Sequence, residues 1–365
     1  MKLFPILDRS YSLLILYVVL FFLQSVETAP PKTPPSDELL NGYSINGSVP
    51  IEYFYVDDTA EDGNFTHYKY SEKSITAMIE GAAKSLKKYE SLYANMMTKR
   101  SAMEPLTSKK ELEIDTLSKI FLVAPKSEWL HVALSAKQFK YSKFAIRNKV
   151  VAVIGSSEPW CEAVLLALGA SHVYTLEYNQ LTLGHEKITT ITGHALLSFY
   201  ESYSSSITYN NNDCNISEST TVDQQTCTPR DQQHTSSAPL FDTVIAISSL
   251  DHDGLGRYGD PLNPDGDLES MSRIARMVKP GGHMFITVPV GSDMVVFNLL
   301  RRYGPIRLPR LLEAAAGFSV VDKLGWEESR FTATPDFRHS YEPVIILKKQ
   351  GDDESTAKKS ATESN

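Results

Sequence analysis

Short apolar runs alternate with helix-patterned segments through the second half of the chain. The run VVAVIG, at 150–155, precedes the helix-like stretch CEAVLLALGA and then a second apolar run, HVYTLEYN. A strand, a helix and a strand within about 30 residues predict a βαβ unit. Further runs typical of strands lie at 187–192, 241–249, 283–291, 318–325 and 343–349, with helical segments at 267–278 and 307–317. The alternation predicts an α/β fold with a Rossmann-like, doubly wound and mostly parallel sheet.

The N-terminal part of the chain has a different pattern. Residues 1–29 contain the apolar run YSLLILYVVLFFL, which is shorter than the roughly 20 residues of a membrane-spanning helix. We therefore expect a cleaved signal peptide or an uncleaved signal anchor. Residues 30–67 are rich in Pro, Asp, Asn and Gly and predict a linker or stem. Apolar spacing within 68–142, from Ile75 to Met96 and again from Leu112 to Phe121, predicts a helical N-terminal layer.

Three further segments complete the expected organisation. Residues 143–350 form the α/β domain, interrupted at about 201–237 by a polar stretch with few large apolar side chains. A compact domain rarely holds so long a loop in its interior, so this stretch is expected to be an exposed, disordered insertion. The polar tail at 351–365 is also expected to be disordered.

Composition excludes several classes of protein. Hydrophobic residues make up 42% of the 365 residues, enough for a sizeable core. The formal charge of -8 argues against a broad surface for nucleic acid. Three cysteines cannot form a disulfide scaffold, and no Cys/His spacing indicates zinc. A calcium loop around Asn263 and Asp265 fails because Pro261 and Ser272 stand at ligand positions, so no metal site is predicted.

Three N-x-S/T sequons, at Asn46, Asn64 and Asn215, agree with an N-terminal signal sequence. We therefore expect a secreted or lumenal glycoprotein, held by a single N-terminal membrane anchor if the signal is not cleaved. Cys214 and Cys227 flank a polar stretch. An oxidising compartment would allow a disulfide between them, and two free thiols are the equal alternative.

Small and acidic residues follow the first two predicted strands of the α/β domain. Gly155, Ser156 and Ser157 form a turn before a helix, where the backbone can approach a ligand closely. Taken alone, this glycine is explained equally well by a plain tight turn. Glu177 ends the second strand, at roughly the 20-residue separation at which an acidic side chain reaches ribose hydroxyls. Together these residues favour a nucleotide-like ligand bound by Glu177 over the alternative that Glu177 is only a solvated carboxylate at the end of a strand.

The densest polar segment follows the fourth predicted strand. Asp251, His252, Arg257 and Asp260 lie in this loop, where a substrate and a general base would be positioned. His252 is the preferred base because the ordinary pKa of histidine lies near neutrality, with Asp251 orienting it or Asp260 as a substitute. Arg257 would bind a polar or anionic part of the acceptor. The alternative is structural: the glycines and prolines serve turns, and Asp267 caps the following helix.

These segments, in their order, resemble the motifs of class I S-adenosylmethionine-dependent methyltransferases. The resemblance rests on VVAVIGSSEP, the acidic end of VYTLEYN, FDTVIAISSLDHDG and VKPGGHMFITVPVG, across about 148–349. More narrowly, SSLDHDGLGRYGDPLNPDGDLE followed by KPGG, VPVG and LGWEE resembles the family known as domain of unknown function 268. The resemblance implies S-adenosylmethionine as cofactor. The cofactor-binding residues that it implies are Gly155, Ser156, Ser157, Glu177, Tyr178 and Ser249.

Three functional hypotheses remain open on the sequence. The resemblance implies methyl transfer to a small-molecule or glycan acceptor, such as a hydroxyl, with no nucleic-acid partner. The alternative is a non-catalytic secreted or membrane-anchored glycoprotein that retains the fold as a binding module, because only Gly155 of a Gly-x-Gly-x-Gly pattern is present. A nicotinamide-dependent oxidoreductase is less favoured, because pyrophosphate needs the missing glycines for close backbone approach.

Overall fold

The computed structural model describes residues 35–54, 67–103, 142–192, 195–196, 199–200, 240–258, 260–334 and 341–351. Several expectations fall outside these described residues: the signal sequence, the helical stretch 112–121, the insertion 201–237, the tail after Gly351, the sequons Asn64 and Asn215, and the cysteines Cys214 and Cys227. Within the described ranges, no helix is both long enough and apolar enough to cross a membrane.

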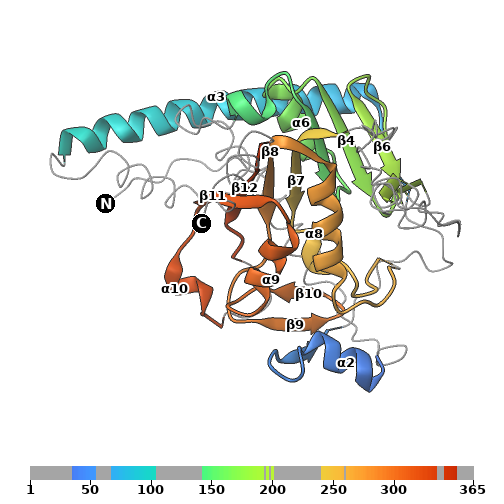
Figure 1. Ribbon diagram of the computed structural model, residues 1–365. Helices are drawn as coiled ribbons and strands as arrows, with labels where there is room; N and C mark the ends of the chain where they lie inside the picture. The colour runs from blue at the N-terminus through green and yellow to red at the C-terminus, as the bar shows by residue number, and fades with distance from the viewer. Residues whose placement is uncertain are drawn as a thin grey trace, which may run out of the picture.

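A seven-stranded sheet with the order β11-β12-β8-β7-β3-β4-β6 forms the centre of the fold (Figure 1). Its strands are β3 (Val150–Ile154), β4 (His172–Glu177), β6 (Ile188–Thr192), β7 (Phe241–Ile247), β8 (Val278–Thr287), β11 (Phe318–Leu324) and β12 (Val344–Lys349). The five strands from β6 to β8 are parallel, and β12 is antiparallel to both of its neighbours. Because the chain builds outward from β3 through β4 and β6 and then from β7 through β8, the boundary between β3 and β7 is the topological switch point.

Helices cover both faces of this sheet, so the predicted doubly wound α/β fold is confirmed (Figure 1). The helical elements are α2 (Asp37–Tyr43), α3 (Glu72–Met103), η1 (Ser142–Ile146), α6 (Trp160–Ala167), η3 (Leu250–His252), α8 (Gly266–Met277), α9 (Arg307–Ala314) and α10 (Glu328–Phe331). Alternate residues of β3 serve the two hydrophobic cores: Val151 and Val153 pack with α6 and α3, while Ala152 and Ile154 pack with α8 and α9. The long helix α3 forms the expected N-terminal layer.

A second sheet, with the order β1-β9-β10, places an N-terminal segment against the loop after β7. Its strands are β1 (Ile51–Tyr53), β9 (Met294–Phe297) and β10 (Leu300–Arg302). Tyr43 and Val49 are buried against Leu255, Val295 and Phe297. The expectation that 30–67 is a linker or stem is therefore wrong for residues 36–54. A short helix and a three-residue strand carry too little periodicity to be recognised, and their burial depends on partners far away in the sequence.

A third pairing joins the residues before α3 to the edge of the candidate site. β2 (His67–Tyr70) is parallel to β5 (Gln180–Leu183), which follows β4 directly. The Tyr70 hydroxyl donates a hydrogen bond to the Ser157 carbonyl oxygen, at 3.3 Å. The N-terminal layer thus contacts the turn after β3.

Candidate functional site

The turn after β3 and the loop after β7 meet at the switch point, where Gly155 lies against Ser249. Gly155 has a φ of +72°, in the left-handed region that glycine adopts without strain. A Cβ atom at this position would overlap the Ser249 hydroxyl and lie 2.9 Å from Ser249 Cβ. Only glycine therefore allows this close contact between the two loops, and the turn is more than a simple change of chain direction.

Glu177 ends β4 beside this turn and is buried, with 9% of the residue exposed. Oε2 accepts a hydrogen bond from the Ser156 backbone N–H at 2.7 Å. Oε1 accepts two from Asn179, from its backbone N–H at 2.9 Å and its side-chain amide at 3.2 Å. A carboxylate offers about four acceptor positions. The backbone of Tyr178 also stabilises this carboxylate, so Glu177 retains room for at most one further hydrogen bond.

Ser157 and Tyr178 are also expected to bind the cofactor; Ser157 belongs to the turn after β3, and Tyr178 follows Glu177. Ser157 is exposed and contributes its carbonyl oxygen to the contact with Tyr70. Tyr178 is partly buried against the core that contains α8. Burial raises the pKa of Tyr178, and the charges of Asp253 and Asp260 raise it further. The structure thus brings the predicted cofactor residues together at one edge of the sheet.

Asp251 and His252 are adjacent in space, and both are turned into the protein. His252 Nδ1 lies 2.6 Å from the Leu299 carbonyl oxygen, and Nε2 lies 3.5 Å from a carboxylate oxygen of the fully buried Asp251. A carbonyl oxygen only accepts, so Nδ1 carries the proton. Both ring nitrogens therefore face protein atoms. This geometry supports a tether between η3 and the β9–β10 connection, and it does not support His252 as the base that faces an acceptor.

Arg257 lies in the same loop and contacts two neighbours. Its guanidinium carbon is 5.1 Å from the centre of the Tyr258 ring, and Nη1 is 3.5 Å from the Leu299 carbonyl oxygen. The Tyr258 ring in turn meets His252 edge to face, with centroids 5.7 Å apart. Arg257 is held at the rim of the site, where the expected contact with a polar acceptor stays a prediction.

Asp260 organises the loop that follows η3. Its carboxylate accepts hydrogen bonds from the backbone N–H groups of Gly254 at 2.7 Å, Gly256 at 3.2 Å and Tyr258 at 3.2 Å. Three donors fix the carboxylate within the turn. The expectation that Asp260 could replace His252 as the base is therefore not supported, because its acceptor positions serve the backbone.

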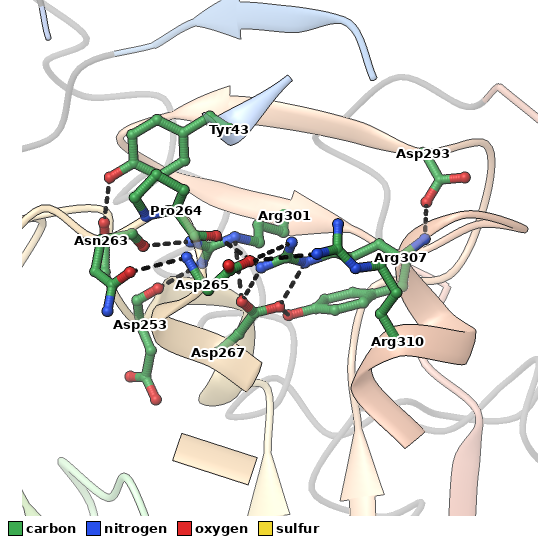
Figure 2. Close-up of polar contacts among 12 residues, drawn as sticks. Tyr43, Asp253, Asn263, Pro264, Asp265, Asp267, Asp293, Arg301, Arg307 and Arg310 are labelled. Atoms are coloured by element: carbon green, nitrogen blue, oxygen red, sulfur yellow. Dashed lines mark hydrogen bonds and ion pairs between the residues drawn. The ribbon is translucent and has the colours of Figure 1, made fainter. Parts of the chain in front are cut away.

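Asp253 is the functional candidate that sequence reasoning passed over. Burial raises the pKa of this carboxyl to about 8, against a hydrogen bond from Ser270 and with the nearby charge of Asp260. The charge of Asp253 also raises the pKa values of Tyr178 and Tyr200, after the larger effect of their burial, so Asp253 lies within electrostatic reach of the end of β4. Figure 2 shows its side chain directed away from the arginine cluster described next. The sequence offered four acidic residues in one loop and no means of ranking their burial.

A buried ionic cluster fixes the base of this loop (Figure 2). Asp267 is fully buried; Arg307 donates to both of its oxygens, Tyr303 Oη donates at 2.9 Å, and Arg301 Nε lies 3.7 Å away. Arg301 also donates to the backbone carbonyl oxygens of Asp253, Asn263 and Pro264. The expectation that Asp267 caps α8 is wrong, because its carboxylate binds Arg301 of β10 and Arg307 of α9 instead.

The described residues offer neither a metal-binding cluster nor a reactive thiol. Among the described residues, no group of three or more His, Cys, Asp or Glu side chains could hold a metal ion. Cys161 is a buried free thiol on α6. Burial raises the pKa of this thiol well above its ordinary value, which keeps it protonated and unreactive.

Comparison with known proteins gives a partial family match. Residues 207–334 match the family described as Caenorhabditis protein of unknown function, DUF268. A search of curated protein sequences finds no match.

Solved structures resemble the chain only distantly. They include a 1,6-didemethyltoxoflavin-N1-methyltransferase from Burkholderia thailandensis, at 16% identity and a TM-score of 0.35, covering 68% of this chain and 92% of that one. An S-adenosylmethionine-dependent methyltransferase from Mesorhizobium loti has 11% identity and a TM-score of 0.33, covering 61% and 98%. A candidate methyltransferase from Streptococcus mutans has 7% identity and a TM-score of 0.32; the match covers 58% of this chain and 47% of that one, about half its length.

The family match covers the loop after β7, the ionic cluster and α9, and it does not reach Gly155 or Glu177. The resemblance to domain of unknown function 268 that the sequence motifs predicted is therefore confirmed over residues 207–334.

Proposed function

We propose that this chain binds S-adenosylmethionine at the carboxyl ends of β3, β4 and β7 and transfers its methyl group to a hydroxyl of a small molecule or glycan. The observation that carries the proposal is the convergence of Gly155, Glu177 and Asp253 at the topological switch point. In open α/β sheets, ligands bind at this place because the loops on either side diverge there.

The residues present fit a ribose-containing cofactor. Glu177 has at most one acceptor position left, which a ribose hydroxyl would use. The left-handed Gly155 keeps the turn free of a side chain where the two loops approach each other. When bound, S-adenosylmethionine supplies an electrophilic methyl group on a sulfonium, so the protein must mainly align the acceptor and take its proton.

Asp253 is the proton acceptor in this proposal. Its backbone is clamped, because its N–H donates to the Leu250 carbonyl oxygen and its own carbonyl oxygen accepts from Arg301. Its side chain lies near Tyr178, the residue that follows Glu177. A carboxylate whose pKa is raised to about 8 is a far stronger base than an ordinary aspartate. His252 is then a positioning residue that ties η3 to Leu299.

Methyl transfer tests this assignment directly. The intact protein is incubated with methyl-labelled S-adenosylmethionine and fractionated hydroxyl acceptors, namely sugars, glycans and small alcohols, and labelled product is counted. We expect Asp253→Asn to lower the transfer rate by about 10²–10⁴-fold with cofactor affinity unchanged. The wild-type rate should rise with pH up to about 8, as Asp253 loses its proton. A rate that Asp253→Asn leaves unchanged, or a profile that is flat in this range, would remove Asp253 from the reaction.

A non-catalytic binding module is the second candidate, and one observation favours it. The Ser156 N–H, which a bound ligand could otherwise use, already donates to Glu177, and Glu177 has at most one acceptor position left. A site with so few open polar groups could hold a ligand without turning it over. Cofactor binding without labelled product from any acceptor class would favour this candidate.

A further inference from the structure

A second carboxyl lies directly behind the turn after β3 and takes no part in the function proposed above. Glu162, in the first turn of α6, is 0% exposed. Its Oε1 accepts a hydrogen bond from the Thr175 hydroxyl on β4, at 2.8 Å. Its Oε2 is buried and has no hydrogen-bond partner among the described residues. A buried charge with a single donor would be costly, so the protonation state of this group is a structural question.

Burial and the nearby charge of Glu177 oppose a negative charge on Glu162. Burial raises the pKa of its carboxyl, hydrogen bonds from the Thr175 and Ser156 hydroxyls oppose the rise, and the charge of Glu177 adds to it. The other titratable groups that feel Glu162 are Cys161 on the same helix and Tyr70 on β2, neither of which is a cation.

Glu162 and Glu177 therefore compete for one negative charge. Two carboxyls that feel each other do not both ionise easily in a buried site. Burial raises the pKa of both carboxyls. Glu177 accepts three hydrogen bonds from N–H donors at 2.7–3.2 Å, whereas the well-formed hydrogen bond to Glu162 comes from the Thr175 hydroxyl, at 2.8 Å. Since donors stabilise the charged form, the charge belongs on Glu177 and the proton on Glu162.

We propose that Glu162 is a positioning residue, a protonated carboxyl that supports the Ser156 turn from α6 and leaves Glu177 as the ionised acid of the site. The protonation of Glu162 follows from its contacts alone. The effect on ligand binding rests on the proposed function.

Thermal unfolding tests the protonation state without any ligand. The variant Glu162→Gln mimics a neutral carboxyl, and Glu158→Gln removes one carboxylate from the exposed face of the same turn as a matched control. An acid whose folded pKa is raised destabilises the fold as pH rises above its unfolded value of about 4.5. The melting temperature of Glu162→Gln, relative to wild type, should therefore rise between about pH 4 and pH 8, by roughly 2 °C or more.

The contrary result is equally clear. A difference between Glu162→Gln and wild type that stays constant with pH, as expected for Glu158→Gln, or one that becomes unfavourable as pH rises, would mean that Glu162 is ionised in the folded protein. The comparison uses the change with pH, so a fixed cost of the amide does not obscure it.

Ligand binding tests the positioning role. The dissociation constant of S-adenosylhomocysteine is measured for wild type and Glu162→Gln between about pH 6 and pH 9. At about pH 7 the two constants should agree within about threefold, and toward pH 9 the wild type should weaken more than the variant as Glu162 ionises beside Glu177. Parallel profiles would overturn the positioning role. Absence of binding by both proteins would overturn the proposed function, while the unfolding experiment would still decide the protonation of Glu162.

Discussion

Removing the Asp267 carboxylate should destabilise the whole region around the loop after β7. Asp267 is fully buried and faces two cations, Arg301 and Arg307, which are themselves buried. Arg307 reaches it from α9 with two donors, and Tyr303 adds a third hydrogen bond. The substitution Asp267→Asn removes the negative charge, and both guanidinium groups lose the buried carboxylate that they pair with.

The expected loss is large for one side chain. Breaking a buried ion pair by removing one partner costs about 3–5 kcal/mol, because the remaining charge stays buried. For a domain of this size each kcal/mol corresponds to roughly 2–4 °C, so the melting temperature should fall by roughly 6–20 °C. Burial alone would raise the pKa of Asp267, but Arg301 and Arg307 hold it below its usual value of 3.8. A lowered folded pKa means that this stabilisation is complete above the unfolded value and is lost as pH falls below it.

Urea-induced unfolding at about pH 7 and at about pH 2, which lies below the usual carboxyl pKa of 3.8, measures both effects. Arg310→Ala is the matched control, since Arg310 is 39% exposed and lies 3.9 Å from the exposed Asp265. This control should change the unfolding free energy by less than about 1 kcal/mol. If Asp267→Asn proves as mild as Arg310→Ala, or if its cost is the same in acid, the cluster does not hold this region together by charge.

Three further outcomes test other parts of the account. Gly155→Ala should cost about 2–4 kcal/mol in urea unfolding, because its Cβ is strained at a φ of +72° and overlaps Ser249; Ser249→Gly should recover part of the loss, and no recovery would contradict the contact. Tyr43→Phe removes the hydrogen bond to the Gly254 carbonyl oxygen and should cost about 0.5–1.5 kcal/mol, whereas an unchanged midpoint would mean that residues 36–54 contribute little there. Asn46 is exposed in a turn and should carry a glycan in native protein, seen as a mass shift after endoglycosidase treatment; unmodified Asn46 would argue against the secretory pathway.

The strands of the central sheet were predictable because a strand buried on both faces consists of consecutive apolar residues. Val150–Ile154 and Phe241–Ile247 are almost wholly buried between two layers of helices, so each appears as a continuous apolar run. The acidic end of β4 was predictable from spacing, since it lies at a nearly fixed number of residues from Gly155 in a βαβ unit. These features depend on neighbours in the sequence.

The elements that sequence reasoning missed depend on distant partners. β1 is three residues long and is stabilised by β9, more than 200 positions away. Asp267 looked like a helix cap because Arg307 is separated from it by 40 positions. Asp253 and Asp260 are alike in sequence, and only the fold assigns three backbone donors to Asp260 and a raised pKa to Asp253. The sequence names the acidic residues of this loop, but their burial and hydrogen bonds depend on the fold.

Calorimetric titration of the intact protein with S-adenosylhomocysteine tests the central claim most directly. We predict binding with a dissociation constant below about 1 mM, weakened about tenfold or more by Glu177→Gln, because one charge-assisted hydrogen bond to the ligand is lost. Glu158→Gln, a change in an exposed carboxylate of the neighbouring turn, should bind as wild type does. No binding at about 1 mM ligand, or equal affinity of wild type and Glu177→Gln, would contradict a ribose-binding site at the end of β4.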